Sequence, residues 1–158
     1  MCAAPGQDSR RLPSVATIDA RSRRFLERQR VAHLATADAS GAPYVVPICF
    51  VLIDATLYVA IDEKPKRGAP TQLRRLRNID QNPRVAIVAD VYDDEDWARL
   101  GFVLVRGAAR VLHGGAEHRR AVEGLRLKYP QYRVMALEER PAIAVDVERV
   151  TSWGQIDG

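Results

Sequence analysis

The stretch LYVAIDEKPKRGAPTQLRRLRNIDQNPRVAIVADVY, residues 57–92, says most about the fold of this chain. It opens with an apolar run typical of a strand, continues through a charged loop and a basic helical segment, and ends in a second apolar run. Helix N-terminal N–H groups and cationic side chains both favour phosphate. The stretch therefore predicts a strand, a helix and a strand that together border a candidate anion site.

The basic segment has an amphipathic pattern. Three apolar residues recur at three-residue spacing and are expected to face the sheet: Leu73, Leu76 and Ile79. The same spacing places Arg74 and Asn78 on the opposite side, with Arg75 and Arg77 on the flanks. The Asn82-Pro83 pair is expected to end the helix, because proline disfavours helical backbone in the residue before it.

The rest of the chain predicts a sheet built mostly from turns and hairpins. Helices are expected at 17–29, with Thr17 as N-cap, and at 117–129. Pro47 lacks a backbone donor, so a bulge or another irregularity is expected there. The predicted strands, six in all, are 31–37, 43–53, 57–61, 85–92, 102–112 and 142–150. Because few of them are joined by helices of crossover length, the pattern favours an antiparallel α+β domain, in the form of a barrel.

Length and composition narrow the class of protein. The 158 residues suit one domain, which we expect at 14–158 after a flexible N-terminal tail at 1–13. Two cysteines make no disulfide framework, which favours a cytoplasmic setting, and no apolar window approaches the ~18 residues of a membrane span. The net charge of +4 permits an anionic partner. Nucleic acid is not expected, because no aromatic residues alternate with the basic ones as they do in nucleic-acid binding proteins. The sequence lacks GxGxxG and GxxxxGK[ST] motifs, so a Rossmann or P-loop nucleotide site is not expected. It also lacks a GxSxG motif, so hydrolase chemistry has no support.

Basic residues gather between the predicted strand and helix. Lys64 and Lys66 lie on a loop stiffened by Pro65, and Arg75 follows in the helical segment. Lysine supplies a point charge and arginine a bidentate contact, so these residues suit a phosphate. A solvated run of surface charge is the alternative that spacing alone leaves open.

Other residues capable of chemistry have ordinary structural explanations. The acidic run at 93–96 lacks the glycine and distal glutamate of a calcium loop, so we expect a solvated turn that caps a short helix at Trp97. Cys49 is interpreted as a small core residue, and the three histidines as surface or core residues with haem or metal ligation as the alternative. No catalytic side chain and no metal site are predicted.

The order of these parts resembles the split β-barrels of the pyridoxamine 5'-phosphate oxidase type, which include flavin- and deazaflavin-dependent oxidoreductases. The matching motifs are RVAHLAT at 30–36, GAP at 41–43 with VPICF at 46–50, LY at 57–58 and NPRV at 82–85. Asp62 to Arg67 and Tyr92 to Trp97 are similar to the subgroup that uses coenzyme F-420. The resemblance implies a six-stranded antiparallel split barrel of the FMN-binding type with peripheral helices.

The resemblance also implies a cofactor site. In that family a lysine eight residues before the proline of the Asn-Pro pair binds the cofactor phosphate, and Arg75 stands at this position in the run Arg75-Leu76-Arg77-Asn78. Lys64 and Lys66 resemble the loop that also meets the phosphate. The strand that borders the flavin ring corresponds to Val46, Pro47 and Ile48. The implied cofactor-binding residues are Val46, Pro47, Ile48, Lys64, Lys66, Arg74, Arg75 and Asn78.

These residues lead to a functional expectation. We expect an oxidoreductase that transfers a hydride from reduced deazaflavin, coenzyme F-420, to a small unsaturated or oxidised substrate. FMN-dependent chemistry on the same fold, or a non-catalytic flavin or haem carrier, is the alternative. The resemblance further implies a homodimer with cofactor sites at its interface. Trp97 and Trp153 are interpreted as interface, ring-facing or core aromatics.

Overall fold

The computed structural model describes residues 16–62 and 73–157, which form one curled antiparallel sheet with three α-helices and short 3-10 turns. The strands are β1 (Ala32–Ala37), β2 (Pro43–Ile48), β3 (Phe50–Ile53), β4 (Thr56–Ala60), β5 (Arg84–Val91), β6 (Gly101–Leu112) and β7 (Ala142–Gly154). The helices are α1 (Ala20–Arg28), α2 (Arg74–Gln81) and α3 (Gly115–Lys128), and the 3-10 turns are η2 (Trp97–Arg99), η3 (Pro130–Val134) and η4 (Leu137–Glu139).

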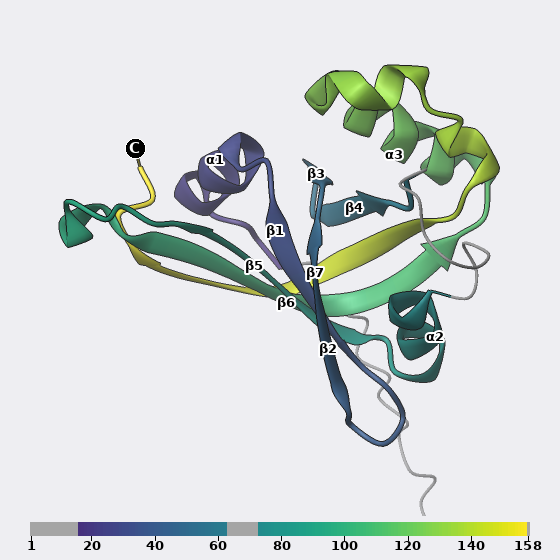
Figure 1. Cartoon of the computed structure of the whole chain (residues 1–158), viewed down its shortest axis with the longest axis horizontal. Coiled ribbons are helices and arrows are strands. Elements are labelled where there is room, and N and C mark those ends of the chain that lie inside the picture. Colours follow the sequence, from purple (N-terminus) through teal and green to yellow (C-terminus); the bar gives the residue numbers. More distant parts are fainter. Residues whose placement is uncertain (1–15, 63–72, 158) are drawn as a thin grey trace, which may run out of the picture.

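The antiparallel α+β architecture is confirmed, but the described sheet has seven strands rather than six, in the order β2-β1-β5-β6-β7-β4-β3. The expected strand at 43–53 is divided at Cys49 into β2 and β3, which lie at opposite edges of the sheet. Two consecutive strands occupy both edges only because the sheet curls into a split barrel (Figure 1).

The expected bulge at Pro47 is wrong. The β1/β2 register runs regularly through Pro47, which pairs with His33. Pro47 is tolerated because β2 is an edge strand, where a missing N–H need not interrupt a ladder. The interruption of this segment lies two residues later, at Cys49, and a register shift occurs between Arg106 and Gly107 in the β6/β7 pairing.

The barrel interior holds the main core, and the helices close around it. Phe25 and Leu26 of α1 are buried in this core, and the N-cap of α1 is Asp19 rather than the expected Thr17. Helix α3 lies over β3 and β4, where Ala121 packs against Tyr58 (Figure 1). These helices leave one part of the outer sheet surface, formed by β1, β2, β5 and one end of β6 and β7, without a helix over it.

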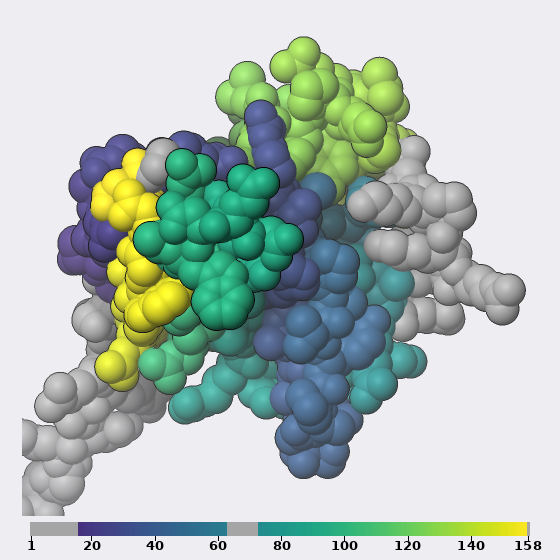
Figure 2. Space-filling model, turned by 60° about the vertical axis from the view of Figure 1, so that its left-hand side comes forward, coloured from purple at the N-terminus to yellow at the C-terminus, as the bar shows by residue number. Residues whose placement is uncertain are grey.

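The end of the β5/β6 hairpin projects beyond the rest of the sheet and carries η2 at its tip (Figure 1). In Figure 2 this tip comes forward beside the C-terminal end of β7, drawn in yellow. Trp97 on the tip is 71% exposed, and Trp153 on β7 is 57% exposed while it stacks on Phe102 with ring centroids 5.9 Å apart. Both tryptophans therefore lie outside the core, and the core interpretation of them is wrong.

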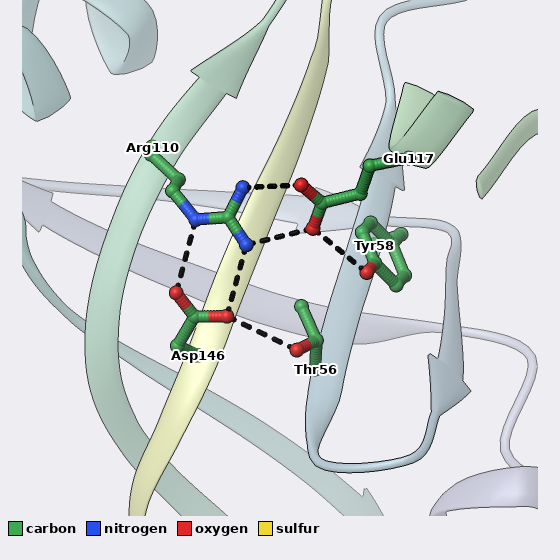
Figure 3. Close-up of polar contacts among 5 residues, drawn as sticks. All are labelled: Thr56, Tyr58, Arg110, Glu117 and Asp146. Carbon is green, nitrogen blue, oxygen red and sulfur yellow. Dashed lines mark hydrogen bonds and ion pairs between the residues drawn. The ribbon is translucent and has the colours of Figure 1, made fainter. Parts of the chain in front are cut away.

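An ion-pair network on the outer surface ties four elements together (Figure 3). Arg110 of β6 donates from Nε to Asp146 of β7 at 3.0 Å and makes two 2.7 Å hydrogen bonds to Glu117 of α3. Thr56 of β4 donates to the same aspartate at 3.0 Å, and Tyr58 donates to the same glutamate at 2.9 Å. The network fixes α3 against the strands that it covers.

Candidate cofactor site

Helix α2 turns two polar side chains toward the protein interior. Its buried residues are Arg75, Leu76, Asn78 and Ile79, whereas Arg74 and Arg77 are exposed. The expectation that Asn78 lies on the exposed side is therefore wrong, and Arg75 lies within the buried face rather than on its flank. The 100° step between helical residues places Arg75 beside Leu76 and Ile79, so the buried face is wider than the apolar spacing indicates.

Arg75 is the most unusual side chain of the helix. It is only 9% exposed, and its Nε has no hydrogen-bond partner among the described residues. Burial lowers its pKa, and attraction to Tyr44, Asp62 and Tyr132 opposes that shift. Because an arginine stays protonated in proteins, a positive charge with an unused donor is held inside the molecule.

The other two α2 residues of the expected set have partners within the chain. Asn78 is 3% exposed and donates from Nδ2 to Thr36 Oγ1 of β1 at 3.0 Å. The Arg74 guanidinium lies over the Tyr44 ring of β2, 5.2 Å from its centroid. Asn78 thus anchors α2 to the sheet, and Arg74 covers an aromatic face, which leaves Arg75 as the one of the three with an unused buried donor.

The strand expected to border a flavin ring is divided between the two faces of the sheet. Ile48 is buried and Val46 is half-buried on the inner face, whereas Pro47 is exposed on the outer face. This alternation follows from the period of two in a strand. Only the side chains of Val46 and Ile48 therefore share the inner face with Arg75, while the backbone of all three residues lies along an edge of the described sheet.

Tyr129 contacts the backbone where β2 ends and β3 begins, at residues 48–50, which we call the seam. Its hydroxyl accepts a 3.0 Å hydrogen bond from the Phe50 N–H and lies 2.9 Å from the Phe50 carbonyl oxygen and 3.0 Å from that of Arg30. Burial raises the pKa of Tyr129 to about 12. The phenol therefore stays neutral and ties the end of α3 to the point where the chain changes edges.

A cavity of about 450 Å³ opens beside this seam. Its volume and its mostly apolar and aromatic wall are typical of a small-molecule site. Asp62, only 7% exposed, and Tyr132, only 4% exposed, belong to the wall, and the Asp62 carboxylate also attracts the Arg75 charge. The lining residues are Arg30, Cys49, Asp62, Tyr129, Pro130, Gln131, Tyr132 and Met135.

Protonation states in the cavity wall are set by burial. The pKa of Tyr132 is raised well above its usual range, first by burial and then by the neighbouring Cys49 thiol. Tyr132 therefore keeps its proton at neutral pH and can donate a hydrogen bond to a ligand. Lys128, next to Tyr129, has its pKa lowered to about 8 by burial.

The expected site residues are partly brought together. Arg75, Val46 and Ile48 share one side of the sheet, and Asn78 supports them from α2. Lys64 and Lys66 lie outside the described residues. Sequence reasoning missed the tyrosines at 129 and 132. Pro130 was the available signal, because it follows α3 and begins η3, the segment that carries Tyr132.

The remaining candidates have structural roles or no site. Asp96 caps η2 by accepting from the Ala98 N–H at 3.0 Å, as expected for the acidic turn. His118 is buried with Nε2 2.8 Å from the Arg140 carbonyl oxygen, and His33 and His113 are exposed. Across 16–62 and 73–157, no three metal-ligating side chains gather into a site, and no helix is long and apolar enough to span a membrane.

Comparisons with known proteins agree with this architecture. A 5a,11a-dehydrotetracycline/5a,11a-dehydrooxytetracycline reductase from Streptomyces rimosus is 30% identical over 96 residues, which span 61% of this chain and 65% of the reductase. The conserved protein Rv2991 from Mycobacterium tuberculosis superposes with a TM-score of 0.70 at 17% identity, covering 89% of this chain and 86% of its own. The haem storage protein HutZ from Vibrio cholerae superposes with a TM-score of 0.65 at 17% identity, covering 85% and 94%.

The two structural likenesses are both below 25% identity and establish the fold alone. The match to the reductase spans about two thirds of that relative, so the activity of the reductase is not assigned to this chain. A broader match decides the classification, because residues 18–154 correspond to the pyridoxamine 5'-phosphate oxidase family and include every described strand. This chain belongs to the pyridoxamine 5'-phosphate oxidase family.

Proposed function

We propose that this protein is an oxidoreductase that uses reduced deazaflavin, coenzyme F-420, to transfer a hydride to a small unsaturated or oxidised substrate. FMN in the same site is the alternative cofactor. Membership of the family and the likeness to a 5a,11a-dehydrotetracycline reductase support redox chemistry on this fold. Two cysteines without a disulfide framework support a cytoplasmic location.

The observation that carries the proposal is the state of Arg75. A buried charge is unfavourable unless it is paired, and a buried donor is unfavourable unless it is used. Arg75 is nine-tenths buried, and its Nε has no partner within the described chain. A ligand phosphate would supply both the opposite charge and the missing acceptor.

The surroundings of Arg75 suit the rest of a flavin-like cofactor. Asp62, which attracts the Arg75 charge, also lines the 450 Å³ cavity, whose aromatic and apolar wall suits a planar ring. The open edge of β2 at Val46, Pro47 and Ile48 offers backbone groups to such a ring. By family resemblance, Lys64 and Lys66 would add positive charge near the phosphate, and this excess of charge favours the more anionic deazaflavin over FMN.

When bound, the cofactor supplies the hydride, and the protein supplies position and electrostatics. Arg75 holds the phosphate, and Asn78 keeps α2 in place through Thr36. Tyr132, whose raised pKa keeps it protonated, would donate a hydrogen bond to a ligand in the cavity. The aromatic wall excludes water from the reacting atoms. No side-chain nucleophile is required, so we assign no catalytic residue.

We also propose that the protein forms a homodimer with cofactor sites near its interface. The outer face of β1, β2, β5, β6 and β7 supports the homodimer, because none of the described helices covers it and it exposes Val45 and Trp153 by 58% and 57%. Exposed apolar faces of this kind mark protein interfaces. A second copy would cover both side chains.

Fluorescence titration tests cofactor binding directly. We expect the purified protein to bind F-420 or FMN, and we expect Arg75→Ala to weaken binding about 10- to 150-fold, which corresponds to the loss of a hydrogen bond to a charged group, about 1.5 to 3 kcal/mol. Arg77→Ala is the matched control, because Arg77 is exposed on the same helix. If neither cofactor binds below high micromolar concentration, the proposal fails.

Turnover separates an enzyme from a carrier. An oxidoreductase oxidises the bound reduced cofactor when an acceptor such as menadione is added, and it does so faster than the same cofactor free in solution. A carrier binds the cofactor without accelerating that oxidation. Haem titration of the same protein tests the remaining carrier alternative through its absorption spectrum.

A further inference from the structure

The outer sheet face that the three described helices leave uncovered carries opposite charges at its two ends. Three arginines from neighbouring strands surround a hollow of about 470 Å³ at one end: Arg84 of β5, Arg106 of β6 and Arg149 of β7. Small side chains form its floor, among them Ala35, Ala37 and Ala86, and Glu148 is the one carboxylate among its described lining residues. We call this hollow the arginine groove.

The arginines of the groove are exposed, and none of them forms an ion pair or a side-chain hydrogen bond with a described residue. Other surface arginines of this chain are paired, for example Arg110 with Glu117 and Arg120 with Asp54. The small floor leaves room above the strands that larger side chains would fill. The groove therefore presents three unneutralised guanidinium groups around an open space.

The other end of the same face is acidic and aromatic. Asp94 and Glu95 lie exposed on the β5/β6 hairpin tip, and Asp90 lies exposed on β5 just before it. Asp93 and Asp96 are engaged in the turn itself, since both accept backbone N–H groups and both lie within 3.5 Å of Arg99. The three remaining carboxylates are accessible to a partner, as are Trp97 and Trp153.

An apolar band separates the two ends. Leu104 of β6 is two residues from Arg106 on one side and two residues from Phe102 on the other, so all three project from the same face. Val88 and Val45 extend this band across β5 and β2. Along the strands the face thus runs from basic through apolar to acidic.

We propose that a second copy of this chain covers this face, with the acidic hairpin tip of each protomer seated in the arginine groove of the other. A two-fold axis through the apolar band places the basic end of one protomer over the acidic end of its partner. Each dimer then contains the tip-to-groove contact twice. This inference rests on the proposed homodimer and is independent of the cofactor.

The chemistry of the two ends is complementary in detail. Asp94 and Glu95 supply carboxylates for three guanidinium groups that have no described partner, and interfaces gain specificity from such opposed charges. Trp97 and Trp153 supply aromatic faces, on which arginine stacks. The hairpin projects beyond the sheet and so reaches a neighbouring molecule before the rest of the surface does (Figure 1).

Charge exchange tests the contact. The groove variant is Arg106→Glu with Arg149→Glu, and the tip variant is Asp94→Lys with Glu95→Lys. Each variant alone would oppose like charges twice in a dimer, so we expect its dimer dissociation constant to rise at least about 10-fold in sedimentation analysis. An equimolar mixture restores opposite charges at both contacts, so it should form a heterodimer of about wild-type affinity.

A control variant carries the same charge change elsewhere. Arg24→Glu with Arg119→Glu alters two exposed arginines on α1 and α3 and should leave the dissociation constant unchanged. Circular dichroism verifies that all variants fold. Wild-type dimers with unaffected groove and tip variants, or a mixture that fails to recover, would overturn the tip-to-groove contact and leave the homodimer standing. A wild-type protein that stays monomeric at all concentrations would overturn both.

Discussion

Two arginines of this molecule occupy opposite electrostatic situations. Arg110 lies on the surface with a side chain 42% exposed, and two carboxylates accept from it at 2.7 to 3.1 Å. These hydrogen bonds raise its pKa. Arg75 is 9% exposed, has an unused Nε, and has its pKa lowered by burial. Arg110 is therefore paired on the surface, where an ion pair contributes little to stability. Arg75 is incompletely paired in the interior, where an uncompensated charge is most unfavourable.

The difference distinguishes a structural arginine from a binding arginine. Arg110 links β6, β7 and α3 and needs nothing further (Figure 3). Arg75 is held in an unfavourable environment by the packing of Leu76 and Ile79 in the core. Unsatisfied buried groups of this kind are retained at functional sites. Removing the charge of Arg75 should therefore raise the free energy of unfolding, whereas removing the charge of Arg110 should lower it.

Arg75→Met is expected to have the largest effect on the protein without cofactor. It removes a desolvated charge and keeps an apolar side chain of similar length, so the free energy of unfolding should rise by about 1 to 2 kcal/mol. The lost attraction to Asp62 limits this gain. Urea denaturation measures it, with Arg77→Met as the exposed control. A marked loss of stability would show that Arg75 is a structural residue like Arg110.

Lys128→Met probes a cation of intermediate burial. Lys128 Nζ lies 4.0 Å from the Phe50 ring centroid and 3.4 Å from the Leu26 carbonyl oxygen, so it is only partly satisfied. Below pH 8 the variant should be more stable than the wild type by about 1 kcal/mol.

The pH dependence of that gain follows from the folded-state pKa of about 8. Between about pH 8 and pH 10 the unfolded chain binds more protons at this lysine than the folded chain does, so wild-type stability rises with pH across this window. The difference between the two proteins should therefore shrink toward pH 10. Thermal denaturation at several pH values measures it, and a gain independent of pH would contradict the assignment to Lys128.

Arg110→Met should have the smallest effect and the opposite sign. The pair with Glu117 is exposed, so we expect a loss of about 0.5 to 1 kcal/mol at neutral pH. Arg110 lowers the pKa of Glu117, so the stabilisation is present above the unfolded pKa of about 4.3 and is lost as the pH falls through the lower folded value. The difference between wild type and variant should disappear in acid, and cofactor affinity should not change.

Much of this architecture was predictable from local patterns. The alternating apolar runs and turn residues predicted the antiparallel α+β class. A turn also formed between the strands predicted at 31–37 and 43–53, where the Asp38 carboxylate accepts from the Ser40 and Ala42 N–H groups. The division at Cys49 was not predictable, because VVPICFVLI is one unbroken apolar run. Which half pairs with β1 and which with β4 depends on how the sheet curls.

The candidate site was predictable only in part for a related reason. The position of Arg75 before the Asn-Pro pair marked it, but its burial depends on packing of α2 against β1 and β6. Arginine spacing alone resembles solvated surface charge. Tyr129 and Tyr132 reach the seam from a segment about 80 residues away in sequence, as the Phe50 hydrogen bond shows. No local pattern contains such a contact.

The central claim is that Arg75 binds the phosphate of the cofactor. Comparing the binding affinities of FMN and riboflavin tests this claim most directly. The two ligands differ only in the phosphate, so titrating both against wild type and Arg75→Ala isolates that contact. We predict that wild type prefers FMN about 10- to 150-fold, that Arg75→Ala loses most of this preference, and that riboflavin affinity stays the same. An equal preference for FMN in both proteins would contradict the account.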